Sequence, residues 1–160
     1  MTEKRCLNTG KKCIRVIGCG NLLMGNDSAG LRVLDILEKS CSGLELIEGG
    51  TGGIGLLPLI EGADLVIIAD AMTGICKNPG DIRIFAETPP YKPSRMSFQD
   101  IGVAEVIDIA RELNPGTEII AVGIEAGTIA EYSDKIDPGV MEGVRNASIL
   151  IMDVVDEKDN

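Results

Sequence analysis

Hydrophobic positions fall into short runs separated by loops rich in glycine and proline. Continuous or alternating apolar runs predict strands at residues 13–17, 44–48, 64–70, 81–85 and 118–124. Apolar residues at helical spacing predict helices at residues 31–40, 54–60, 97–113 and from 138 toward the end. Because strands alternate with helices, we expect a three-layer α/β fold with a mostly parallel sheet.

The chain shows neither an internal repeat nor a linker that would divide it. We therefore predict one α/β domain over residues 13–155, with a flexible extension at 1–12 and an acidic tail at 156–160.

Two helix starts are marked by capping patterns. Ser97-Phe-Gln-Asp100 has the form of a capping box, and Asp137 precedes Pro138 as an N-cap before a first-turn proline.

Two aspartates follow predicted strands. Asp27 lies in the glycine-punctuated loop after the first strand, and Asp70 closes the third. Right-handed crossovers would place these two strands side by side, with their carboxyl ends facing one crevice. We expect both acids to open onto that crevice, where paired carboxylates suit a divalent cation or a positioned water. The alternative is that Asp27 caps its helix and Asp70 turns the chain.

Amino-acid composition limits the partners and the catalytic groups that this chain can use. The net charge of −10 argues against nucleic acid or an anionic membrane as a partner, since phosphate binding needs clustered Lys and Arg. The chain has no histidine, so any acid–base chemistry must come from carboxylates, Lys, Tyr or Cys. Its five cysteines form no C-x-x-C pair, so we expect most of them to be reduced and structural. No apolar leader or membrane-length run is present, and we expect a cytoplasmic monomer.

The first loop invites comparison with a dinucleotide fingerprint. Gly18-Cys-Gly20 is followed by Leu23 where the third glycine would stand, and Glu48 ends the second strand where a ribose-binding acid would be needed. Asp27 would repel phosphates, which disfavours a nucleotide-binding oxidoreductase. Cys19 could be a nucleophile, but a structural role is favoured because no histidine can generate its thiolate.

Two further segments have open interpretations. Glu48-Gly-Gly-Thr-Gly-Gly53 is either a tight corner between strand and helix or a backbone surface for a bound peptide. Gln99, at the start of a predicted helix, could be solvated, could support a cap, or could lend its amide oxygen to a metal.

Five blocks occur in one order along the chain: Gly18-x-Gly-Asn21 with Asp27 and Gly30, Glu48-Gly-Gly-Thr51, Ile67-Ile-Ala-Asp-Ala71, Asn78-Pro-Gly-Asp-Ile-Arg-Ile84 and Val122-Gly-Ile-Glu125. As an ordered set they resemble the hydrogenase maturation protease family. The resemblance implies an α/β/α sandwich with a mixed five-stranded sheet. It also implies an endopeptidase that removes the C-terminal extension of a [NiFe] hydrogenase large-subunit precursor once nickel is inserted.

The resemblance also implies roles for individual residues. Asp27 and Asp70 match two acids that face the metal, and Gln99-Asp-Ile-Gly102 matches an H-x-x-G motif with glutamine in place of histidine. Glutamine is a weaker ligand, so the expected nickel would come mainly from the precursor. We predict Asp27 and Asp70 as catalytic, these two with Gln99 as metal-facing, and Gly50 and Thr51 as lining the groove for the tail. The alternative is a non-cleaving chaperone that probes the same precursor.

Overall fold

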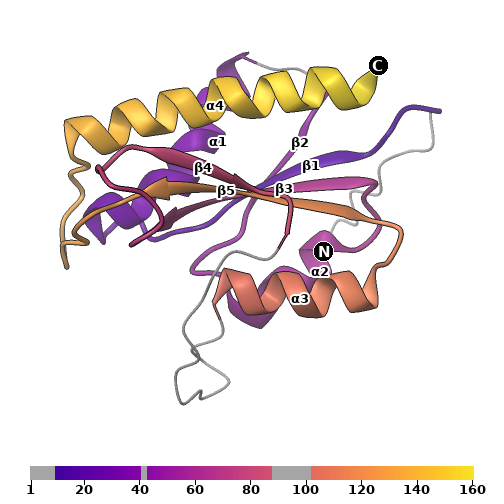
Figure 1. Ribbon diagram of the computed structural model, residues 1–160, viewed down its shortest axis with the longest axis horizontal. Helices are drawn as coiled ribbons and strands as arrows, with labels where there is room; N and C mark the ends of the chain where they lie inside the picture. Colours follow the sequence, from indigo (N-terminus) through magenta and orange to yellow (C-terminus); the bar gives the residue numbers. More distant parts are fainter. Residues whose placement is uncertain (1–9, 41–42, 88–101) are drawn as a thin grey trace.

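The computed structural model describes residues 10–40, 43–87 and 102–160, which form a sheet covered by helices on both faces (Figure 1). The strands are β1 (Ile14–Gly18), β2 (Glu45–Glu48), β3 (Leu65–Met72), β4 (Ile82–Phe85) and β5 (Glu118–Glu125). The α-helices are α1 (Ala29–Ser40), α2 (Leu57–Ile60), α3 (Val103–Leu113) and α4 (Pro138–Asp159), and the 3-10 turns are η1 (Gly25–Ser28) and η2 (Gly53–Leu56). Helices α1 and α4 cover one face of the sheet, and α2 and α3 cover the other.

The strand order is β2-β1-β3-β5-β4, and only the edge strand β4 runs antiparallel to its neighbour. This arrangement confirms the predicted α/β/α sandwich with a mixed five-stranded sheet. Strands β1 and β3 are adjacent, with Gly18 opposite Ala69. The chain leaves β1 and β3 in opposite directions across the sheet, so the switch point of the doubly wound topology lies between their carboxyl ends.

The sheet has an apolar layer on each face because side chains alternate along its strands. On β3, Leu65, Ile67 and Ala69 pack toward α1 and α4, whereas Val66 and Ile68 pack toward α2 and α3. The same alternation places Asp70 on the α2 and α3 side, at the end where the apolar run stops. Burial of the run thus fixes the face on which this carboxylate lies.

Helix α1 rests directly on the ends of the two central strands. A Cβ atom at Gly30 would collide with the carbonyl oxygens of Cys19 and Ala69, and one at Gly18 would collide with the carbonyl oxygen of Gly30. Because these are backbone contacts, no side chain could move aside to accept a larger residue. The paired glycines therefore bring the turn that contains Asp27 against the carboxyl ends of β1 and β3.

Several sequence-based expectations need correction or fall outside the described residues. Helix α4 continues to Asp159, so all but the last residue of the segment 156–160, which we predicted as an acidic tail, belongs to this helix. The predicted capping box at Ser97–Asp100 lies outside the described residues. Cys13 is disulfide-bonded, an exception to the expectation that most of the cysteines are reduced, whereas Cys19 and Cys76 are free. None of the helices in residues 10–40, 43–87 and 102–160 combines the length and apolarity needed to cross a membrane.

Candidate functional site

Asp27 lies in the 3-10 turn η1, which joins the loop after β1 to helix α1. Its Oδ2 atom accepts the backbone N–H of Asn21 at 3.0 Å, a bond that closes the loop on itself. This bond runs back to the loop and not forward into the helix, so the alternative in which Asp27 caps α1 is wrong. Burial raises the pKa of Asp27, and the Asn21 bond acts in the opposite direction.

The position of Asp27 is fixed by its neighbour Asn26, which is almost fully buried. The Asn26 amide nitrogen donates to the carbonyl oxygens of Ala126 and Thr128 and to Oδ2 of Asp137, at 3.0, 2.9 and 2.8 Å. Its amide oxygen accepts the backbone N–H of Asp137 at 2.9 Å. One side chain therefore ties η1 to the loop after β5 and to the start of α4.

Asp70 is the one polar residue of strand β3, and its side chain is half-buried. It lies close enough to Asp27 for the two charges to interact. Burial, followed by the negative charge of Asp27, raises the pKa of Asp70 to about 7, although the N–H of Ala71 partly stabilises the ionised form. The two acids that the sequence places 43 residues apart thus act on each other. The structure therefore brings the two carboxyl groups near each other at the carboxyl edge of the sheet, as expected from the topology.

Cys19 is buried close to these two acids. It follows Gly18 on β1, its N–H donates to the carbonyl oxygen of Ala69, and its side chain is buried against Gly49. Burial raises the pKa of the Cys19 thiol, and the charges of Asp70 and Asp27 raise it further. A thiol held neutral in this way is a poor nucleophile, which supports the structural role.

The glycine-rich corner after β2 lies beside the Asp27 loop. The N–H of Gly20 donates to the carbonyl oxygen of Gly50 at 2.7 Å, and the N–H of Gly49 donates to that of Gly18 at 2.8 Å. Gly50 has a φ of 61° and, like Thr51, is exposed. The corner is therefore a tight turn whose outer side remains open to solvent, so both interpretations of this motif are compatible with its geometry.

The first loop uses its backbone donors internally. From Cys19 to Gly25, six of the seven N–H groups donate to protein acceptors: those of residues 19, 20, 21, 23, 24 and 25. A phosphate cradle needs such N–H groups to point at the ligand. Together with the negative charge of Asp27, this bonding argues against the nucleotide-binding alternative.

Asp27 and Asp70 offer carboxylate oxygens, the donors that hard cations and waters prefer. Among residues 10–40, 43–87 and 102–160, no group of three His, Cys, Asp or Glu side chains is arranged to hold a metal ion. Gln99 lies outside the described residues, so its predicted metal-facing role stays a prediction. Two acids alone suit brief engagement of a metal held by another molecule better than permanent retention.

Sequence reasoning missed the polar contacts that order the rim of the crevice. Asn26 was overlooked because an asparagine before an aspartate in a loop has no distinctive pattern. Asp137 occupies the N-cap position of α4 as predicted, but its carboxylate accepts Asn26 in place of a helix N–H. Glu125 is buried and both its oxygens accept the N–H of Gly74, which shapes the loop after β3. The sequence placed Glu125 at the end of an apolar strand and in the block Val122-Gly-Ile-Glu125, but neither pattern indicated its contact with Gly74.

The fold and the site define a doubly wound α/β protein with an acidic centre at its switch point. A sequence profile described as "Hydrogenase maturation protease" matches residues 32–154, a stretch that includes Asp70 and begins just after Asp27. The chain belongs to the hydrogenase maturation protease family, as the resemblance indicated.

Individual relatives agree with this assignment. The chain is 32% identical over 103 residues to the hydrogenase 2 maturation protease of Escherichia coli, covering 61% of the chain and 63% of that relative. It is 28% identical over 152 residues to a putative hydrogenase maturation protease of Methanocaldococcus jannaschii, covering 91% and 95%. The solved structure of the hydrogenase maturating endopeptidase HybD from E. coli matches with a TM-score of 0.74 and 27% identity, covering 91% and 93%. The chain thus spans less than two thirds of the first of these relatives.

Proposed function

We propose that this protein is an endopeptidase that removes the C-terminal extension of a [NiFe] hydrogenase large-subunit precursor after nickel insertion. In this proposal the nickel belongs to the substrate, and Asp27 and Asp70 engage it at the mouth of the crevice. The observation that supports the proposal most is that these two acids lie close together at the carboxyl ends of β1 and β3, near enough for the charge of Asp27 to raise the pKa of Asp70. The chain also belongs to this family.

The two acids have different environments, which suggests different duties. Asp27 keeps one oxygen on the Asn21 N–H and is held by the Asn26 anchor, so its carboxylate is positioned before substrate arrives. Asp70, with its pKa near neutrality, can gain or lose a proton at working pH. A metal held by the precursor would polarise the scissile carbonyl or a water. Ionised Asp70 is then available to face the metal or to accept a proton from the attacking water.

The precursor tail needs a path to these acids. Gly50 and Thr51 are exposed beside the Asp27 loop, and Gly50 has open space where a Cβ atom would stand. We propose that this corner lines the groove for the tail and that Gln99 completes or flanks the metal-facing set. A small residue at such a corner lets an extended peptide approach the backbone closely.

The direct test incubates the purified protein with a nickel-loaded large-subunit precursor and follows release of the C-terminal peptide by mass spectrometry. We expect release by the wild type and none by Asp70→Asn, since the amide can neither face the metal as an anion nor accept the proton. Circular dichroism should show that Asp70→Asn is folded. Asp153→Asn, at an exposed position of helix α4, is a matched control that should retain cleavage.

The outcomes separate the alternatives. Normal cleavage by Asp70→Asn would refute the proposed role of this residue. Binding of the precursor by the wild type without peptide release would refute the protease and favour a non-cleaving chaperone.

A further inference from the structure

Four large apolar side chains are exposed on the loops that follow β1 and β5: Leu22, Leu23, Ile129 and Tyr132. We call them the apolar rim. Leu22 and Leu23 are 52% and 63% exposed, and Tyr132 is 92% exposed. Exposed apolar residues scattered singly need no explanation, but a group of them beside a functional site commonly marks an interaction surface.

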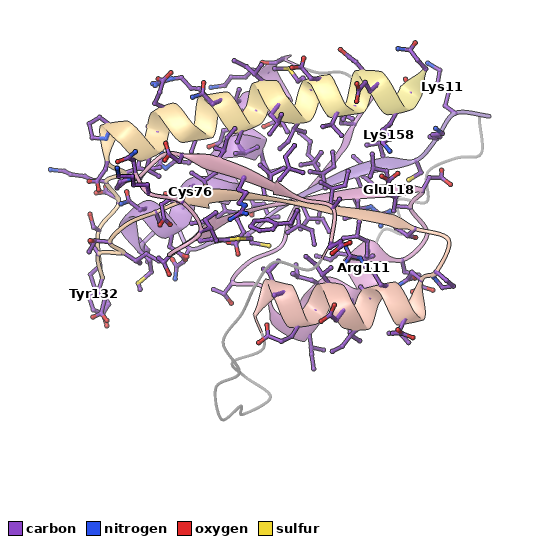
Figure 2. All side chains as sticks on the ribbon, in the orientation of Figure 1. Lys11, Cys76, Arg111, Glu118, Tyr132 and Lys158 are labelled. Carbon is purple, nitrogen blue, oxygen red and sulfur yellow. The ribbon has the colours of Figure 1, made fainter. Side chains whose placement is uncertain are left out.

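The rim is one structure, although its residues come from two loops. The loop after β1 pairs with the loop after β5: the N–H of Ser133 donates to the carbonyl oxygen of Leu23 at 2.8 Å, and the N–H of Gly25 donates to that of Ser133 at 2.7 Å. Leu23 and Tyr132 therefore flank the same pair of backbone bonds. Figure 2 shows Tyr132 projecting away from the body of the fold.

The same loops hold the acidic site. Leu22 and Leu23 lie between Asn21, whose N–H binds Asp27, and Asn26, which anchors the turn. Both loops follow strands, β1 and β5, that run parallel to β3, so the rim and the acids share the carboxyl edge of the sheet. A molecule whose tail reached Asp27 and Asp70 would have its body over or beside this rim.

Folding alone does not account for these residues. The chain has only four aromatic residues, two Tyr and two Phe, and one of them is almost wholly in solvent. Tyr132 also has a φ of 53°, a conformation that a bulky side chain rarely adopts and that costs free energy. Tyrosine is among the residues that contribute most at protein interfaces, because a large rigid surface is buried with little loss of entropy.

We propose that the apolar rim is the docking surface for the folded body of the hydrogenase large-subunit precursor, separate from the groove that takes its tail. This inference rests on the proposed function and deepens it. Within three positions of Tyr132, the exposed charged residues are Glu131, Asp134 and Lys135, which leaves this segment with a net charge of −1. The matching surface of the precursor is accordingly an apolar patch bordered by lysine or arginine.

The test measures binding and cleavage separately. The double variant Leu23→Ser with Tyr132→Asn removes the two most exposed side chains of the rim, and asparagine tolerates the positive φ at position 132. Leu113→Ser is the matched control, because Leu113 is 65% exposed and lies on α3 just before the start of β5. Binding to immobilised nickel-loaded precursor is followed by interferometry, and cleavage is followed by mass spectrometry over a range of precursor concentrations.

We expect the double variant to raise Kd and KM by about tenfold or more while kcat stays within about threefold of the wild type. The control should leave all three within about twofold, as exposed positions outside an interface usually do. Unchanged Kd in the double variant, or an equal loss in the control, would overturn the docking surface. So would a wild-type dimer in size-exclusion chromatography that the double variant abolishes, since a second copy would then cover the rim.

Failure of the proposed protease function can be told apart from failure of the docking surface, because cleavage and binding are measured separately. If the wild type binds precursor without cleaving it, the protease proposal fails, and the effect of the double variant on Kd still decides whether the rim is the docking surface.

Discussion

Asp70 has the most unusual chemistry of the described acids. It ends a strand whose other positions are apolar, so part of its solvation is lost, and Asp27 adds a like charge. Both effects favour the protonated form. An acid kept near its titration point destabilises the free protein at neutral pH, because the unfolded chain can ionise that carboxyl without penalty. Residues selected for a site commonly carry such a cost.

The pH dependence of stability follows from this imbalance. The folded state retains the Asp70 proton up to about pH 7, whereas the unfolded state releases it near its ordinary value of 3.8. The contribution of Asp70 to the free energy of unfolding therefore decreases as pH rises across that window, and it is flat outside it. We expect Asp70→Asn to be more stable than the wild type at about pH 8, by on the order of 2 kcal/mol after allowance for partial exposure.

Urea denaturation of the wild type and Asp70→Asn from acidic to mildly alkaline pH measures this difference. It should shrink toward zero at the acidic end. Asp27→Asn is the informative companion, since removing the Asp27 charge should move the transition to lower pH. A difference that grows toward acidic pH would contradict the expected sign.

At the scale of elements, the turn η1 is the part of the fold that sets the site. Its four residues carry no large apolar side chain, and its geometry depends on the Asn26 side chain and on close packing of Gly30 against two backbone carbonyl oxygens. The partners of Asn26 lie 100 or more residues away in the sequence. A local turn is thereby held by long-range hydrogen bonds, so the loop after β1 and the start of α4 act together.

Replacing Asn26 with alanine tests this dependence. The substitution leaves the buried partners at Ala126 and Asp137 without their donor and acceptor, and we expect a loss of about 3 kcal/mol in the free energy of unfolding. Asn146→Ala, on the exposed side of α4, should change it by no more than about 0.5 kcal/mol. Urea denaturation measures both values. Equal stability of the two variants would show that Asn26 does not anchor η1.

At the scale of the whole molecule, the doubly wound sheet gathers the ends of distant segments at one edge. The loops after β1, β2, β3 and β5 all emerge there, whereas the apolar layers on both faces lie behind them. Under the proposed function, this edge receives a large substrate that presents a tail and a metal from outside. This edge is less suited to a small molecule that must be enclosed.

This arrangement predicts that nickel is required in the precursor and not in the protein. Because the described residues contain only two carboxylates for the metal and no third ligand of the His, Cys, Asp or Glu type beside them, the protein freed of metal by chelation should bind nickel weakly. We expect metal-free protein to cleave nickel-loaded precursor and to leave nickel-free precursor intact. Elemental analysis of the protein before the assay, with peptide release as the readout, checks this. Cleavage of nickel-free precursor would contradict it.

Much of the architecture was accessible from local patterns. Apolar runs fixed the strands to within a residue or two at most ends, and their alternation with helices fixed the fold class, since burial and backbone hydrogen bonding act on short segments. The placement of Asp27 and Asp70 together followed from the handedness of crossovers. The resemblance to a known family supplied the expected activity.

Other features were decided only in three dimensions. Whether Asp27 caps its helix or closes its loop depends on the distance to Asn21, and whether Asp137 caps α4 depends on Asn26, more than 100 residues earlier. The raised pKa of Asp70 and the hydrogen bond that joins Leu23 to Ser133 likewise depend on neighbours that the chain brings together only when it folds. The sequence by itself determined which segments are buried and that the first and third strands lie side by side. The tertiary structure decided which polar groups meet, because hydrogen bonds and charges act between neighbours in space.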